Sequence, residues 1–162
     1  MRVEAKLGDM GLVLPGEMKV PADFLVKWRQ IRVIGNRVII AGHGPRSPDG
    51  TFAGPPGKVG SDVTLEQGRA AARAAGLAIL ADLRREIGDL DRVVSWIRVF
   101  GLVNAAPGFV ALALVIDGFT DLMVELFGAE AAICPRAVAG AAELALNSPV
   151  IIEAEVEISA GS

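Results

Sequence analysis

Apolar residues along this chain follow two spacings, and the changes between them mark strands and helices. Two-residue alternation predicts a hairpin in which Gly35-Asn36 joins two strands, and it predicts a further strand at 93–103. Two more extended segments close the chain, and one short edge strand is expected near Thr51-Phe52. The predicted main strands are Val26–Ile34, Arg37–Gly42, Val93–Val103, a segment opened by Pro135 and Arg136, and Val150–Ile158.

Three- and four-residue spacing predicts two long helices. The first begins at Thr64, whose spacing from Gln67 is that of a capping box, and ends at Gly88. The second ends at Gly128 and places its acidic residues away from its apolar stripe. The residues expected to face the core are Ala72, Ala75, Ile79, Leu83 and Ile87 in the first helix, and Leu112, Val115, Phe119, Leu122 and Leu126 in the second.

The order of these elements predicts an α+β fold with two helices on one face of a mixed sheet. Residues 1–23 read as a leader packed on the domain, and residues 24–162 as the domain itself. We expect the last two strands to form a hairpin turning at Asn147-Ser148. No helix remains to cover the second face of the sheet, so that face is expected to be buried by other copies of the chain.

The composition of the chain indicates which classes of molecule it is expected to bind. The 162 residues carry a net charge of −3, which argues against nucleic acid and favours small molecules or proteins. A single cysteine indicates a reducing, cytoplasmic location, and the longest apolar run, Phe109–Ile116, is too short to span a membrane. With one histidine and one cysteine, the sequence predicts no metal site, and we expect no cofactor.

Arg136 is the strongest candidate for a binding or catalytic residue. It opens a strand of small apolar residues, where burying an unpaired guanidinium is costly, so we expect it to meet an anion. An arginine fork suits a carboxylate because it donates two parallel hydrogen bonds. An ion pair within the protein is the alternative. Glu153 shares one strand face with Glu155 and Glu157, which makes a solvated acidic face equally compatible with its position.

Several motifs, in order along the chain, make it resemble the Rid/YjgF family of reactive-intermediate (enamine/imine) deaminases. The resemblance covers about Lys27 to Ile158. It implies a chorismate-mutase-like fold assembled as a trimeric barrel, with a small carboxylate-bearing metabolite bound in each intersubunit cleft. The segments that carry it are Trp28–Asn36, Val38–Pro45, Gly57–Gly60, Asp89–Val94, Asp121–Gly128, and the final arginine and glutamate strands.

The resemblance implies a role for each matching residue. Arg136 falls on the carboxylate-binding arginine, and Glu153 on the acid that holds the attacking water. The implied substrate-binding residues are Arg136, Trp28, Ala41, Gly42, Phe109 and Ala137. Trp28 and Ala41 depart from the family, which has tyrosine and usually serine at these positions, and the chain has no tyrosine. His43 and Cys134 are secondary candidates, for proton transfer and as a thiol whose pKa a neighbouring cation lowers. The preferred alternatives are a hydrogen-bonded structural histidine and a cysteine buried as a small apolar residue.

The implied activity is hydrolysis of an enamine or imine to a keto acid and ammonia. A non-catalytic metabolite-binding trimer is the alternative that Trp28 and Ala41 favour, and ribonuclease action is disfavoured by charge and by the single histidine. In a terminal hairpin, Glu153 lies opposite about Ala142, roughly 20 Å along the strands from Arg136. We therefore expect the pocket to combine Arg136 of one subunit with Glu153 of its neighbour.

Overall fold

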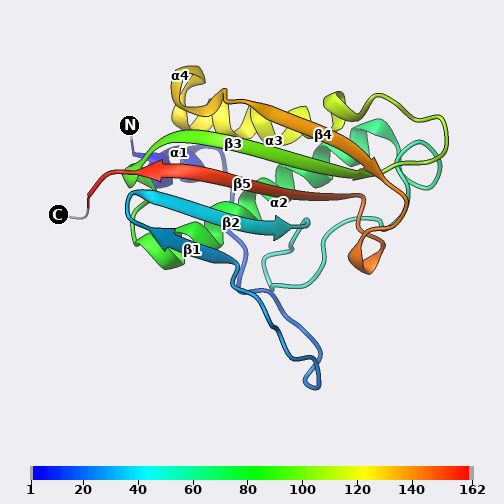
Figure 1. Ribbon diagram of the computed structural model, residues 1–162, viewed down its shortest axis with the longest axis horizontal. Helices are drawn as coiled ribbons and strands as arrows, with labels where there is room; N and C mark the ends of the chain where they lie inside the picture. The colour runs from blue at the N-terminus through cyan, green and yellow to red at the C-terminus, as the bar shows by residue number, and fades with distance from the viewer. Residues whose placement is uncertain (1, 161–162) are drawn as a thin grey trace.

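A five-stranded mixed sheet with helices on one face forms the body of the protein (Figure 1). The computed structural model describes residues 2–160. Its helices are α1 (Val3–Asp9), α2 (Leu65–Ile87), α3 (Leu112–Phe127) and α4 (Ala129–Ala132), with two 3-10 turns at Leu90–Arg92 and Ala145–Asn147. Its strands are β1 (Ile31–Ile34), β2 (Arg37–His43), β3 (Val93–Asn104), β4 (Arg136–Ala141) and β5 (Val150–Ile158).

The last strand lies in the middle of the sheet. The strand order is β1-β2-β5-β3-β4, in which β4 runs parallel to β3 and all other neighbours are antiparallel. The predicted terminal hairpin is therefore wrong, because β4 and β5 are separated by β3. The crossover through α3 returns the chain beside β3 in the parallel direction, so β4 takes the outer position and β5 enters between β2 and β3.

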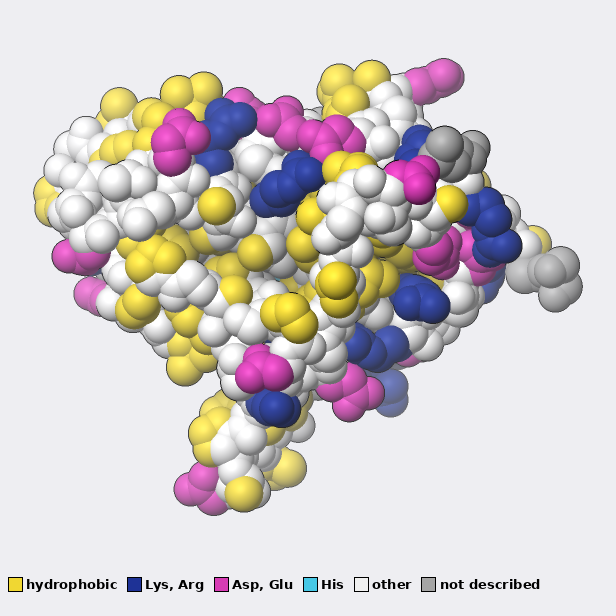
Figure 2. All heavy atoms as spheres, turned by 180° about the vertical axis from the view of Figure 1, so that it is seen from behind, with side chains coloured by type: hydrophobic (Ala, Val, Ile, Leu, Met, Phe, Trp, Pro, Cys, Tyr) yellow, Lys and Arg dark blue, Asp and Glu magenta, His cyan; other side chains and the backbone are white. Residues whose placement is uncertain are grey.

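The first strand is shorter than predicted and begins at Ile31 instead of Val26. Its register pairs Ile31 with Ile40, so residues before Ile31 would need partners beyond Ile40, where the β2 ladder becomes irregular. Residues 17–30 instead form an arm that projects from the body (Figures 1 and 2). Near Phe52 the structure has only an isolated bridge to Arg46 in place of the expected edge strand.

Both long helices are confirmed. Thr64 and Gln67 form the predicted capping box at the start of α2, and Gly88 ends that helix. The apolar residues expected to face the core are buried in α2, and in α3 all of them except Leu112 are buried. The two helices approach so closely that a Cβ added at Gly118 would lie 2.1 Å from the carbonyl oxygen of Arg69. This contact explains a glycine in the middle of α3.

Bulges change the predicted faces of β3. Strict alternation places Trp96 on one face with Arg98 and Phe100, but Trp96 is 3% exposed and packs edge-to-face against Phe119, with ring centroids 5.4 Å apart. The pairing with β5 shifts register between Trp96 and Arg98, and again near the start of the strand. The shift turns Trp96 into the core while Arg98 stays on the helix-free face.

The amino-terminal helix packs on the same core. Val3 and Leu7 of α1 are buried, and Lys6 donates a 2.8 Å hydrogen bond to the carbonyl oxygen of Leu126 at the end of α3. Within residues 2–160, no helix has both the length and the apolarity needed to cross a membrane. None of the residues from 2 to 160 forms a layer over the helix-free face of the sheet (Figure 1).

We predict that Gly118→Ala lowers the free energy of unfolding by about 1–3 kcal/mol, because the new methyl group meets backbone and cannot be accommodated by a rotamer change. Gly8→Ala is the matched control, since no atom lies within 4 Å of its added Cβ. Urea denaturation followed by circular dichroism measures both. Equal stability of the two variants would contradict the close helix contact.

Candidate functional site

A hollow of about 170 Å³ lies on the helix-free face, where β2, β5 and β3 meet. We call it the open-face hollow. It is lined by Ile39, Ile40, Ala41, Arg98, Phe100, Glu153, Ala154 and Glu155. Two residues of the sequence-predicted site, Ala41 and Glu153, are therefore brought together. The hollow holds about six water volumes and is smaller than the roughly 300 Å³ of a typical ligand pocket, so by itself it does not enclose a ligand.

The strand register places charged side chains across this hollow. Glu153 on β5 pairs with Phe100 on β3, and Glu155 pairs with Arg98. Glu155 also forms an ion pair with Arg37 of β2. Glu153 is exposed, with its carboxylate on the helix-free side. Sequence reasoning did not assign Arg98 to the site, because strand periodicity groups it with Trp96 and Phe100 and carries no sign of the bulge that separates Trp96 from the other two.

Arg136 lies on the opposite face of the sheet from Glu153. It pairs with Val99, which is buried beneath the helices, and its Nη1 donates to Asp117 Oδ1 and to Thr120 Oγ1 of α3, both at 2.9 Å. Its side chain keeps 22% exposure. Within one chain, the sheet therefore lies between the side chains of Arg136 and Glu153. The reason expected from sequence, a distance along a terminal hairpin, is wrong.

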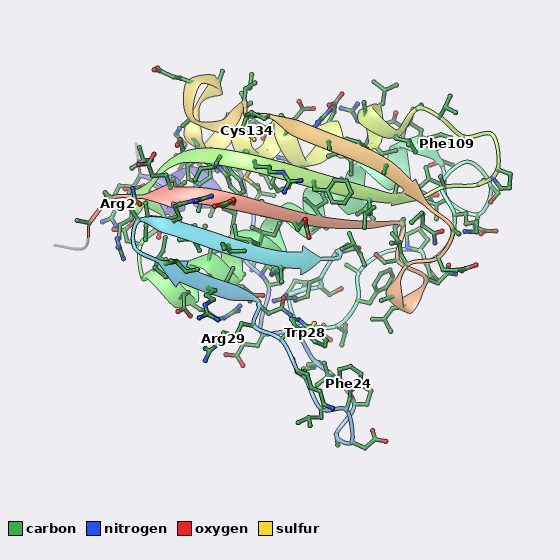
Figure 3. The ribbon with its side chains drawn as sticks, viewed as in Figure 1. Arg2, Phe24, Trp28, Arg29, Phe109 and Cys134 are labelled. Carbon is green, nitrogen blue, oxygen red and sulfur yellow. The ribbon has the colours of Figure 1, made fainter. Side chains whose placement is uncertain are left out.

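The other predicted substrate-binding residues are dispersed in one chain. Trp28 lies on the arm, 47% exposed, with its ring 6.0 Å from that of Phe24 (Figure 3). Phe109 lies at the far end of the sheet, against Gly60 (Figure 3). Gly42 sits where a Cβ would be 2.7 Å from Ile151 Cγ2. On the edge strand β4, the exposed residue Ala137 pairs with Phe100, a lining residue of the open-face hollow.

His43 belongs to a buried charged network behind β2. Its Nε2 lies 3.0 Å from Asp82 Oδ2, and its Nδ1 lies 2.6 Å from the carbonyl oxygen of Ala41. Arg46 donates to both oxygens of Asp82, at 3.0 and 2.8 Å, and Arg85 donates to Oδ1. The His43 side chain has no exposed surface. Both ring nitrogens are thus occupied within the fold, which removes His43 from the open-face hollow and assigns it a structural role.

The same network fastens the chain that leads into the arm. Arg46 donates to the carbonyl oxygen of Gly16 at 3.0 Å, and Arg85 donates to that of Pro15 at 2.6 Å. Burial raises the pKa of the Asp82 carboxyl, but hydrogen bonds and charges from His43 and Arg46 outweigh it and hold that pKa well below its usual range. Asp82 is therefore ionised and links helix α2, strand β2 and the leader.

Cys134 is half-buried near the start of β4 (Figure 3). Burial raises the pKa of its thiol, and the opposing effect of the Arg136 charge is smaller. The charge of Arg136 thus lowers this pKa less than burial raises it, and the thiol is poorly suited to act as a nucleophile.

One acidic group among the described residues has the spacing of metal ligands. Carboxylate oxygens of Glu4, Asp89 and Asp91 lie within 4.8 Å of one another. Arg2 donates to Asp89 at 2.5 Å and to Asp91 at 3.1 Å, and Asp91 also accepts a hydrogen bond from the backbone of Val3. These oxygens are thus used to hold the amino terminus of α1 against the turn before β3.

Comparisons with known proteins agree with this architecture. Residues 4–158 match the family described as "YjgF/chorismate mutase-like, putative endoribonuclease". The Protein TCP17 of Trypanosoma cruzi is 31% identical over 158 residues, which cover 98% of this chain and 95% of that protein. The chain belongs to the YjgF/chorismate mutase-like family.

Solved structures show the same fold over the full chain. The crystal structure of a "putative endoribonuclease" from Shewanella oneidensis MR-1 has a TM-score of 0.87 and 28% identity, covering 98% of this chain and 100% of that one. A protein from Agrobacterium tumefaciens has a TM-score of 0.85 and 31% identity, covering 98% and 92% of the two chains.

We predict that Asp82→Asn lowers the free energy of unfolding by about 3–5 kcal/mol at neutral pH, because it leaves buried cations without their carboxylate. Asp121→Asn is the control: Asp121 pairs with Arg69, but its side chain is 56% exposed, so we expect a loss of at most about 1 kcal/mol. Urea denaturation of both variants checks this. A loss at Asp82 no larger than that at Asp121 would show that the network does not stabilise the fold.

The stabilisation by Asp82 should depend on pH. Because its folded pKa lies below the value of about 3.9 for an unfolded aspartate, its contribution is fully present above that pH and declines as the pH falls further. The difference in unfolding free energy between the wild type and Asp82→Asn should therefore be constant from pH 5 to 7 and shrink below about pH 4. A difference that grew on acidification would contradict the sign of the shift.

Proposed function

We propose that the protein hydrolyses small carboxylate-bearing enamines or imines to a keto acid and ammonia, in clefts between the subunits of a homotrimer. The observation that carries this proposal is the state of Arg136. Its two hydrogen bonds to Asp117 and Thr120 both use Nη1, and its side chain remains partly exposed on an edge strand. Among the described residues, its Nη2 and Nε have no hydrogen-bond partner, so they can donate to a carboxylate from outside the subunit.

A cleft between subunits follows from the placement of the two proposed catalytic groups. Arg136 reaches the helix side of β4, and Glu153 reaches the helix-free side of β5. No side-chain movement within one chain brings a guanidinium through the sheet. A neighbouring subunit that placed the edge strand β4 against the helix-free face would bring its own Arg136 near this Glu153, and it would also enclose the open-face hollow.

The proposed reaction needs an anchor, a water and a proton acceptor. Arg136 holds the substrate carboxylate and orients the imine carbon. Glu153 accepts a proton from water as the oxygen bonds to that carbon and passes this proton to the imine nitrogen, which gives a neutral carbinolamine. Glu153 then takes the hydroxyl proton of the carbinolamine and delivers it to the nitrogen as the carbon–nitrogen bond breaks, so that ammonia and the keto acid remain. An enamine first takes a proton at its β-carbon and loses one from its nitrogen, which gives the imine.

A non-catalytic trimer that binds a metabolite is the second candidate. Asp117 already neutralises part of the Arg136 charge, and Trp28 and Ala41 replace the hydroxyl-bearing residues of the deaminases that the chain resembles. Trp28 donates through its indole nitrogen but cannot accept a proton there. Carboxylate binding without ammonia release would favour this candidate.

Ribonuclease action, the activity in the names of several relatives, is less compatible with this chain. A pair of histidines acting as acid and base is not available, because His43 is the only histidine and both its nitrogens are engaged in the buried network. The net charge of −3 also gives no general attraction for a polyanion.

We predict that Arg136→Ala lowers kcat/KM for imine hydrolysis by about two orders of magnitude, because the substrate loses its anchor. Arg73→Ala is the matched control, since Arg73 forms a comparable surface ion pair with Glu125 away from the cleft. The assay measures ammonia released from imines formed by an amino-acid oxidase, and circular dichroism verifies folding. A folded Arg136→Ala variant with unchanged kcat/KM would refute this role.

A cleft shared between subunits predicts complementation. Arg136→Ala and Glu153→Gln should each be inactive alone, but co-expressed chains should regain about a quarter of the wild-type activity, since random trimers pair an intact arginine with an intact glutamate at that frequency. Analytical ultracentrifugation gives the oligomeric state of each preparation. If the mixed protein stays inactive while forming trimers, both groups act from one subunit.

A further inference from the structure

Arg98 lies on the helix-free face with Phe100, as two-residue alternation expects, and both line the open-face hollow with Glu153. Trp96 departs from this alternation, because it is buried on the helix side of the sheet. The register shift between Trp96 and Arg98 accounts for the change of side, so the bulge ends next to Arg98. A second shift, between Ile40 and His43 of β2, lies at the opposite wall. Bulges that redirect side chains are frequent beside binding sites.

The charges in the hollow do not pair completely within the chain. Arg37 engages Glu155, the residue that lies directly opposite Arg98. Within residues 2–160, the side chain of Arg98 has no hydrogen bond or ion pair. Glu153 is likewise exposed, and as the proposed holder of the attacking water it must keep its oxygens for that water. Arg98 is thus a cation without an assigned anion, next to the proposed reacting centre.

Covering the helix-free face would make this arrangement costly without a ligand. A second subunit packed on the hollow removes water from the guanidinium of Arg98, and a desolvated charge needs an anionic partner. The α-carboxylate of the substrate is assigned to Arg136. The remaining requirement is a second anion, on the same ligand, near Glu153.

We propose that Arg98 binds a second acidic group of the substrate, so that the protein prefers 2-imino acids with an acidic side chain, of the kind formed from aspartate or glutamate. This inference rests on the proposed function and names its substrate class. Glu153 is opposite Phe100, two residues from Arg98, which makes the two charged residues diagonal neighbours roughly 7–8 Å apart. A side chain of one or two methylene groups fits between an imine carbon at Glu153 and a carboxylate at Arg98.

The test compares kcat/KM for imines formed from glutamate and from alanine by amino-acid oxidases. The wild type should prefer the dicarboxylic imine by on the order of 10- to 100-fold, as expected for a hydrogen-bonded charged group. Arg98→Gln should abolish that preference while leaving the alanine-derived imine almost unaffected, and Arg98→Lys should restore part of it. Arg32→Gln is the control, because Arg32 is on β1, outside the hollow.

A binding measurement separates this inference from the deaminase proposal. Calorimetry with 2-oxoglutarate and pyruvate should show tighter binding of 2-oxoglutarate by the wild type and equal binding of the two by Arg98→Gln. If that difference appears without ammonia release, the deaminase proposal fails and the ligand class stands. If imines are hydrolysed without a preference that depends on Arg98, or if 2-oxoglutarate binds no better than pyruvate, the inference is overturned.

Discussion

The pairing of β5 with both β2 and β3 is the constraint on which the rest of the structure depends. It joins the amino-terminal hairpin to the crossover unit of β3, α3 and β4, which would otherwise share only helix contacts. This pairing also determines which side of the sheet each residue of β5 faces. Val150, Ile152 and Val156 are buried toward the helices, so Glu153 must face the opposite side. A one-residue slip of this strand would bury its glutamates and expose its core.

Local patterns predicted the helices well because the information that specifies them is local. Thr64 and Gln67 mark the start of α2, and Gly88 marks its end, within a few residues of one another and of the apolar stripe. No comparable local sequence signal specifies the position of β5 in the sheet. Whether it pairs with β4 or enters between β2 and β3 depends on the path of α3, which brings β4 parallel to β3 at the edge.

The candidate site was predictable only in part for the same reason. Arg136 stands out as a charged residue that opens a strand of small apolar residues, whereas Glu153 is one of three glutamates on a strand face and is singled out only by the family resemblance. The roles of both residues stay predictions. Arg98 was missed because alternation groups it with Trp96 and Phe100, and no sequence signal shows that a bulge moves Trp96 into the core and leaves Arg98 on the open face. Asp117 was missed as a partner of Arg136 because the contact joins a strand to the helix before it, and a half-buried helix aspartate has no distinctive spacing.

A buried charged network on the helix side of the sheet reaches the wall of the open-face hollow. On its helix side, Asp82 is held by Arg46 and Arg85, and it in turn orients His43. His43 then contacts the carbonyl oxygen of Ala41, whose N–H donates to the carbonyl oxygen of Gln30.

Both backbone groups of Ala41 are therefore fixed where β2 loses its regular register, at the wall of the open-face hollow. A strand end without regular ladder hydrogen bonds would ordinarily be among the more mobile parts of a sheet. The buried ion network removes that freedom, since the shape of this wall is coupled through one histidine to a carboxylate that stays ionised at neutral pH. The electrostatics of the core thus help to preorganise a surface whose own charges remain open to a ligand.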